Sequence, residues 1–192
     1  MTEDILIQAC TNNNAAAQRE LYNRYSRVLF GVCFRYAFRR EDAEDMLQEG
    51  FIKIFKRINT FGNKGNFEGW MKRVMVNTCI NYITKNKKFS EILSLETTYN
   101  IEDCEESIAS KLLGKQVMDC LRMLPIGYRT VINLYAIEGY SHKEISEMLD
   151  IKESTSRSQF IRGKSLLTSI LISKKIMNPD VDTLEWITLL SN

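Results

Sequence analysis

The chain has 192 residues, of which 44% are hydrophobic and 26% are charged, and its formal net charge is +2. This balance is typical of a folded globular protein and excludes an intrinsically disordered chain. No apolar run approaches the ~20 residues that a membrane-spanning helix needs. The acidic opening MTEDILIQAC is also unlike a secretory signal. We therefore expect a cytoplasmic protein with one ordinary domain or two small ones.

Cysteine and histidine usage argues against a metal centre and against a disulfide framework. The five cysteines are Cys10, Cys33, Cys79, Cys104 and Cys120. They are widely spaced, no C-x-x-C pair occurs, and the single histidine, His142, has no neighbouring cysteine. No paired-carboxylate, Cys–His or phosphate-loop pattern stands out either. We predict reduced thiols, no metal, no cofactor, no small-molecule substrate and no enzymatic activity.

Charge is distributed in alternating blocks along the chain. Residues 19–40 hold six bases and one acid, and residues 41–49 hold five acids and no base. Residues 61–88 hold six bases and one acid, and residues 89–110 hold six acids and no base. Residues 111–175 are again basic, with eleven bases and six acids. This pattern predicts two basic surfaces separated by an acidic connector.

The hydrophobic period is helical nearly throughout. Apolar residues recur at spacings of three and four over 21–36 and again over 41–58, which predicts two amphipathic helices. The turn-rich stretch NTFGNKGN precedes a third predicted helix over about 67–85. Its polar stripe consists of Arg73, Asn77, Asn81 and Lys85, each four residues apart. Residues 89–106 are acidic and without period, and we interpret them as a linker.

The second half of the chain is also predicted to be helical. A helix is expected from about 107, and Pro125 is placed to begin the next one, which Gly139 is placed to end. The predicted fold class is all-α, with two small helical domains joined by an acidic linker. The predicted bounds are 1–88 for the first domain, 89–106 for the linker, 107–175 for the second domain and 176–192 for a tail.

The stretch SHKEISEMLDIKESTSRSQFIRGK predicts a helix-turn-helix within the second domain. Ser141 and Glu144 form an S-x-x-E capping box that fixes the start of the first short helix. After the turn, the second helix is expected to expose Arg157, Ser158, Ile161 and Arg162. Arginine, serine and glutamine side chains on such a helix can bond base edges and phosphates in the major groove. The alternative is a helical hairpin whose basic face is only solvated.

Three stretches in order resemble bacterial sigma factors of the extracytoplasmic-function (ECF) group. REDAEDMLQEGFIKIF is similar to the polymerase-clamp helix of that family, and FEGWMKRVMVNTCINYITKNKK is similar to its promoter-melting helix. EGYSHKEISEMLDIKESTSRSQFIRGKSLL is similar to its C-terminal helix-turn-helix. The resemblance covers roughly residues 15–171.

The resemblance implies three sets of functional residues. The polymerase-binding set is Asp42, Asp45, Gln48, Glu49 and Phe51. The promoter-melting set is Phe61, Asn66, Lys72, Arg73, Asn77, Asn81, Lys85, Lys87 and Lys88. The set for the upstream promoter element is Arg157, Ser158, Gln159, Ile161 and Arg162. The implied partners are core RNA polymerase, double-stranded and melted promoter DNA, and an anti-sigma factor, which in the family is commonly membrane-anchored.

Several positions depart from the family pattern. Ser156 and Gly163 replace the more usual valine and alanine, so looser packing of the second helix is expected. Gln159 replaces a more usual arginine. Beyond the family pattern, the tail is predicted to form a short amphipathic helix through Leu184, Ile187 and Leu190 that packs on the second domain.

Two other functions fit parts of the sequence. A stand-alone helix-turn-helix regulator explains the second domain but leaves the DAEDMLQEGF helix without a role. A helical protein-interaction adaptor that does not bind DNA explains the helices but treats the basic faces as merely solvated. Binding to core polymerase separates the sigma interpretation from both.

Overall fold

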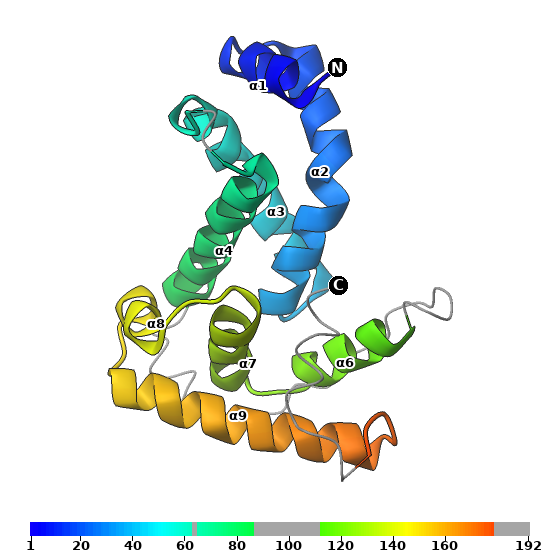
Figure 1. Ribbon diagram of the computed structural model, residues 1–192, viewed down its shortest axis with the longest axis vertical. Helices are drawn as coiled ribbons and strands as arrows, with labels where there is room; N and C mark the ends of the chain where they lie inside the picture. The colour runs from blue at the N-terminus through cyan, green and yellow to red at the C-terminus, as the bar shows by residue number, and fades with distance from the viewer. Residues whose placement is uncertain (63–64, 87–111, 179–192) are drawn as a thin grey trace. The chain divides into compact units, whose positions relative to one another are not determined.

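The computed structural model describes residues 1–62, 65–86 and 112–178, and these described residues fall into two compact units that divide after Ile83. All regular elements in these described ranges are helices (Figure 1), which confirms the all-α prediction. The predicted linker, residues 107–111 of the next predicted helix, and the predicted tail helix lie outside the described residues.

The N-terminal unit is built from α1 to α4 (Figure 1). These elements are α1 (Glu3–Thr11), α2 (Ala15–Tyr36), α3 (Arg40–Arg57), the 3₁₀ turn η1 (Ile58–Thr60) and α4 (Phe67–Asn86). Helix α2 packs along α3, and α1 packs on α2 and η1. The three long helices match the predicted ones, whereas α1 was not predicted.

Buried residues in this unit follow the helical period that the sequence displays. The largest fully buried side chains include Leu21, Leu29 and Tyr36 of α2, Met46 and Ile54 of α3, and Met71 and Met75 of α4. Because the full set of buried positions in each helix recurs at steps of about three and four residues, each helix buries one face and leaves the opposite face to solvent.

The C-terminal unit places three helical segments on one side of α9 (Figure 1). The elements are α6 (Leu112–Arg122), α7 (Ile126–Ile132), the π-helical turn η2 (Asn133–Ile137), α8 (His142–Leu149) and α9 (Glu153–Ser173). Pro125 is the N-cap of α7, and Gly139 follows η2 with a positive φ of 78°, as the sequence predicted.

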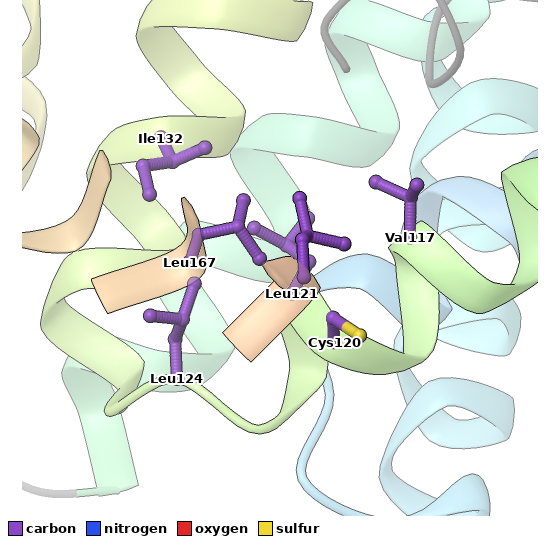
Figure 2. Packing of buried hydrophobic residues seen from close by; sticks show 7 residues of the cluster. Val117, Cys120, Leu121, Leu124, Ile132 and Leu167 are labelled. Atoms are coloured by element: carbon purple, nitrogen blue, oxygen red, sulfur yellow. The ribbon is translucent and has the colours of Figure 1, made fainter. Parts of the chain in front are cut away.

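One hydrophobic cluster holds α6, α7 and α9 together (Figure 2). Its members are Val117, Cys120, Leu121, Leu124, Ile132, Leu167 and Leu171. Burying each such side chain contributes about 1.5–3 kcal/mol relative to exposure. The cluster therefore fixes α9, the second helix of the helix-turn-helix described below, against α6 and α7.

Candidate nucleic-acid interface

The predicted helix-turn-helix is present as α8, a three-residue turn and α9. The capping box at the start of α8 is complete: the Ser141 backbone N–H donates to Glu144 Oε2 at 2.8 Å, and the Glu144 backbone N–H donates to Ser141 Oγ at 3.3 Å. Asp150 ends α8 in the left-handed conformation with φ 53°. A left-handed residue at this position turns the chain sharply, so α9 can begin at Glu153.

We predict that Ser141→Ala lowers the stability of the C-terminal unit by about 1 kcal/mol, because it leaves a helix N–H without its side-chain acceptor. Thermal unfolding measures the change. Ser146→Ala is a control on the same helix, since the Ser146 hydroxyl only donates to the Lys143 carbonyl at 2.7 Å. A loss for Ser146→Ala equal to that for Ser141→Ala would contradict the capping role.

The outward side of α9 carries the residues predicted from the sequence. Arg157, Ser158, Ile161 and Arg162 are all exposed, and we call them the reading face. Ile161 is 64% exposed, an unusual placement for isoleucine. Gln159 is set apart from this face, because it is half-buried and its Oε1 atom is enclosed without a hydrogen-bond partner.

The reading face combines charge, hydrogen bonding and apolar contact. Arg157 forms an ion pair with Glu153 one turn earlier, with Nη2 2.5 Å from Oε1. Ser158 Oγ donates to the Thr155 carbonyl at 3.0 Å, which leaves its lone pairs to accept. An arginine can bond a guanine edge, and an exposed isoleucine can contact a thymine methyl group.

The expectation that Ser156 and Gly163 loosen the packing of α9 is wrong. Ser156 is fully buried, and its Oγ lies 2.9 Å from His142 Nδ1 in α8. A Cβ atom added at Gly163 would lie 2.9 Å from both Ile132 Cδ1 and Tyr128 Cβ, closer than real contacts allow. The small residue therefore lets α9 approach α7 closely.

Helix α4 of the N-terminal unit carries the second set of candidate contacts. Its polar stripe of Arg73, Asn77, Asn81 and Lys85 is exposed along its whole length. Lys72 is half-buried and pairs with Glu68, Nζ to Oε1, at 2.7 Å. The remaining two candidates of this set, Lys87 and Lys88, lie outside the described residues.

The segment before α4 forms an aromatic cluster. The ring of half-buried Phe61 lies 5.0 Å from that of Phe67 and 5.7 Å from that of Trp70. Phe67 belongs to the core at 1% exposure, and Trp70 is half-buried. Exposed Asn66 accepts a hydrogen bond from the Gly69 N–H at 3.1 Å and so helps to begin α4.

Glycine is required in this segment by the backbone. Gly62 and Gly65 have φ angles of 64° and 97°, in the left-handed region that side-chain-bearing residues rarely adopt. The segment is therefore shaped by these two positions and presents partly exposed aromatic rings, on which a base can stack.

Helix α3 presents part of the predicted acidic face. Asp45 and Gln48 are exposed, while Glu49 is half-buried and pairs with Lys53 at 2.7 Å. Ile52 lies one turn after Gln48 and is 53% exposed. Sequence reasoning missed Ile52, although an isoleucine among the polar positions of an amphipathic helix was the available signal.

Two predicted polymerase contacts of α3 have structural roles instead. Phe51 is 3% exposed and packs against Tyr22, with ring centroids 4.6 Å apart, so it is a core residue rather than a surface contact. Asp42 is 9% exposed and accepts hydrogen bonds from the Arg39 N–H at 3.1 Å and the Tyr82 hydroxyl at 3.2 Å. Burial and the Asp42 carboxylate both raise the pKa of Tyr82, which stays a neutral donor. Asp42 thus joins α3 to α4.

Neither a metal centre nor a membrane span is found in the described ranges. No three histidine, cysteine, aspartate or glutamate side chains gather there in a way that would hold a metal ion. None of the helices in that part of the chain combines the length and apolar character needed to cross a bilayer.

Two helical units, one with a polar stripe and one with a helix-turn-helix, define the chain as a two-domain helical protein of the kind that reads nucleic acid. Two family models match it in order: Sigma-70 region 2 over residues 21–89, and Sigma-70, region 4 over residues 114–167. The chain belongs to the sigma-70 family, in the extracytoplasmic-function group.

Relatives match along most of the chain. The ECF RNA polymerase sigma-E factor of Haemophilus influenzae is 29% identical over 178 residues, which cover 87% of this chain and 94% of that protein. The sigma-E factor of Escherichia coli K12 is 25% identical over 178 residues, which cover 87% of this chain and 93% of that protein. The sigma factor SigE of Mycolicibacterium smegmatis is 28% identical over 157 residues, which cover 79% of this chain and 60% of that protein.

Solved structures of similar proteins match less closely. The structure of CnrH in complex with the cytosolic domain of CnrY is 20% identical, covers 88% of this chain and 96% of that chain, and gives a TM-score of 0.47. The structure of the sigma factor RpoE in complex with the anti-sigma factor NepR from Bartonella quintana is 18% identical. It covers 80% of this chain and 96% of that chain, and its TM-score is also 0.47. The assignment rests on the family models and the relatives.

Proposed function

We propose that this chain is a dissociable promoter-specificity subunit that directs bacterial RNA polymerase to initiate transcription, and that it acts in the cytoplasm without catalysing a reaction itself. The observation that carries the proposal is that regions 2 and 4 of the family occur in one chain, each on its own compact unit. A stand-alone helix-turn-helix regulator would need only the second unit.

The division of labour follows from the exposed faces. Asp45, Gln48 and Ile52 on α3 offer a mixed acidic and apolar surface that suits a basic protein partner, for which we propose core polymerase. Asn77, Asn81 and Lys85 on α4 offer amide and ammonium groups suited to the backbone and bases of melted DNA. The reading face of α9 suits the major groove of the duplex upstream element.

Half-buried aromatic rings near the start of α4 could hold a base that has left the duplex stack. Phe61 and Trp70 are half-buried, so each ring keeps one part packed and another part accessible. Removing a base from the duplex stack costs a few kcal/mol, which stacking on aromatic rings can return. We assign the promoter-melting role to this cluster together with Asn66.

An anti-sigma protein, as the family implies, would inhibit the chain by covering the faces that bind polymerase or DNA. Such a partner must mask at least one of the faces on α3, α4 and α9, because all three take part in promoter-directed initiation in the proposed mechanism. The exposed apolar residues Ile52 and Ile161 are the anchor points expected for it.

The test is reconstitution with purified core polymerase. Co-purification must yield a stoichiometric complex, and in-vitro transcription on a genomic fragment library must start at defined sites only when the chain is added. DNA binding without polymerase binding would favour the stand-alone regulator. Binding to neither would favour the helical adaptor.

Charge reversal on α3 tests the polymerase face directly. We predict that Asp45→Lys weakens core binding about tenfold, since a favourable charge contact becomes a repulsive one. Asp45 is chosen because its exposed carboxylate is not tied to a cation on α3, whereas Glu49 pairs with Lys53. A binding titration measures affinity, and circular dichroism checks helicity.

The matched control is Asp4→Lys, the same charge change at an exposed position of α1. It should leave core affinity within about twofold, because a single exposed charge away from the contact acts only through screened, long-range attraction. Equal affinities for the two variants and the parent chain would exclude the Asp45 side of α3 as the polymerase contact.

A further inference from the structure

A buried polar contact joins the two helices of the helix-turn-helix. The single histidine of the chain, His142, lies at the start of α8, and its Nδ1 atom is 2.9 Å from Ser156 Oγ in α9. His142 is 9% exposed and Ser156 is fully buried. A hydrogen bond in such a site is directional and costly to lose, because water cannot replace the missing partner.

Aromatic rings enclose the histidine. Its imidazole stacks on Tyr135 of η2 with centroids 4.3 Å apart and planes within 9°. The ring of Phe160 in α9 meets the imidazole edge-on, with centroids 5.9 Å apart. The same ring is tilted against Tyr135, with centroids 4.6 Å apart. The ring is therefore held by segments before and after the turn, and it cannot rotate without disturbing α9.

Burial and a neighbouring cation favour the neutral form of this ring. Burial lowers the pKa of His142, the nearby Arg157 guanidinium lowers it further, and the Glu153 carboxylate opposes them. A neutral imidazole has one donor nitrogen and one acceptor nitrogen, so its bond to the Ser156 hydroxyl works in either direction.

Ser156 and Phe160 alternate with the reading face along α9. Ser156 directly precedes Arg157 and Ser158, and Phe160 directly precedes Ile161 and Arg162. A rotation of α9 that broke the His142 contacts would swing all four exposed side chains relative to α8. Arginine readout of base edges depends on bidentate geometry, which such a swing would spoil.

We infer that His142 and Ser156 are positioning residues that fix the orientation of the reading face and so set promoter selectivity. The inference rests on the proposed function, since it concerns DNA read by the holoenzyme.

Two substitutions of equal shape isolate the hydroxyl. Ser156→Thr and Ser156→Val give side chains with the same branching at Cβ and similar size, but only threonine keeps the donor and acceptor. Holoenzyme carrying each variant is tested for binding to the preferred upstream element against a scrambled one. We expect Ser156→Val to reduce this discrimination about tenfold, the equivalent of one buried hydrogen bond, and Ser156→Thr to retain it within about twofold.

A spectroscopic readout accompanies the binding assay. Because the chain has one histidine, its imidazole ¹⁵N signals are assigned without ambiguity. These signals should shift in Ser156→Val and keep their parent positions in Ser156→Thr. Equal discrimination by the two folded variants would overturn the inference. Core binding and polymerase-dependent initiation by the same variants report separately on the proposed function, which would stand in that case.

A second variant covers the chance that Ser156→Val does not fold. His142→Phe keeps an aromatic ring against Tyr135 but removes both ring nitrogens, and the freed serine hydroxyl can bond a carbonyl of its own helix. The inference requires the same loss of discrimination in this variant. Full discrimination by a folded His142→Phe holoenzyme would overturn it.

Discussion

Gly163→Val is expected to destabilise the C-terminal unit by about 3 kcal/mol, enough to unfold a marginal domain. The Cβ atom alone would lie 2.9 Å from Ile132 Cδ1 and from Tyr128 Cβ, and 3.4 Å from Tyr128 Cα. The isoleucine methyl group can move aside, but the Tyr128 atoms belong to or adjoin the backbone of α7. Relief therefore requires α7 and α9 to separate, which opens the hydrophobic cluster around Ile132 and Leu167.

Alanine substitutions at two helical glycines provide the matched comparison. Gly31 lies within α2, and an added Cβ atom there meets nothing within 4 Å. Gly31→Ala should raise stability by about 0.5–1 kcal/mol, because alanine is the better helix former. Gly163→Ala receives the same gain but also the overpacking, and should lower stability by about 1 kcal/mol net. Thermal unfolding with hydrogen exchange separates the two units. A stabilising Gly163→Ala would refute the close-approach argument.

Long-range contacts explain why the packing of α9 escaped prediction. The sequence shows that Ser156 and Gly163 are small, and small residues suggest space when the neighbours are unknown. Their neighbours come from α7 and α8, and only the fold reveals that a histidine and a tyrosine fill that space. Residue size alone therefore cannot distinguish a void from a close contact.

Periodicity made the long helices predictable. Helices α2, α3 and α4 each run for 18 residues or more, which gives several repeats of the apolar period. Helix α1 has nine residues and buries only Leu6, Ile7 and Cys10, too few repeats to stand out from a charged, irregular start. Its stability comes from packing on α2, since an isolated helix of this length is marginal in water.

The helical period predicted which candidate residues are exposed. It did not predict which of them have a structural role in the folded unit. Arg157 and Arg162 fall opposite the buried positions of α9 and are exposed as expected. Asp42 and Phe51 lie in a stretch that resembles a partner-binding helix, yet the first joins α3 to α4 and the second packs in the core. A resemblance assigns a role to a whole helix, while burial decides which of its residues can fulfil it.

Ion pairs on the proposed binding helices are weak and local. Arg157 pairs with Glu153, Lys72 with Glu68, and Lys53 with Glu49, each cation lying one turn after its acid. Exposed pairs of this kind contribute about 0.3–0.5 kcal/mol. A charge-assisted contact to phosphate or guanine is stronger, so the pairs of Arg157 and Lys72 do not prevent these side chains from making the proposed DNA contacts.

The reading face and the polar stripe should respond differently to the loss of one charge. If Arg162 bonds a base edge, Arg162→Ala should cost about 1–3 kcal/mol on the preferred promoter and relax the preference at one base position. If Lys85 neutralises a phosphate, Lys85→Ala should weaken all promoters alike and reduce the salt slope by about one ion. Both residues are exposed, so neither substitution should alter folding.

Holoenzyme carrying each variant, bound to a randomised upstream element at two salt concentrations, measures both effects at once. The contrast between the variants is decisive because two merely solvated cations would give nearly equal, small losses. A uniform loss across sequences for Arg162→Ala would make it a phosphate contact and move base recognition to Arg157, Ser158 and Ile161. No loss for either variant, with promoter selection intact, would remove Arg162 and Lys85 from the DNA interface, because sequence preference must then arise from other residues of the chain or of polymerase.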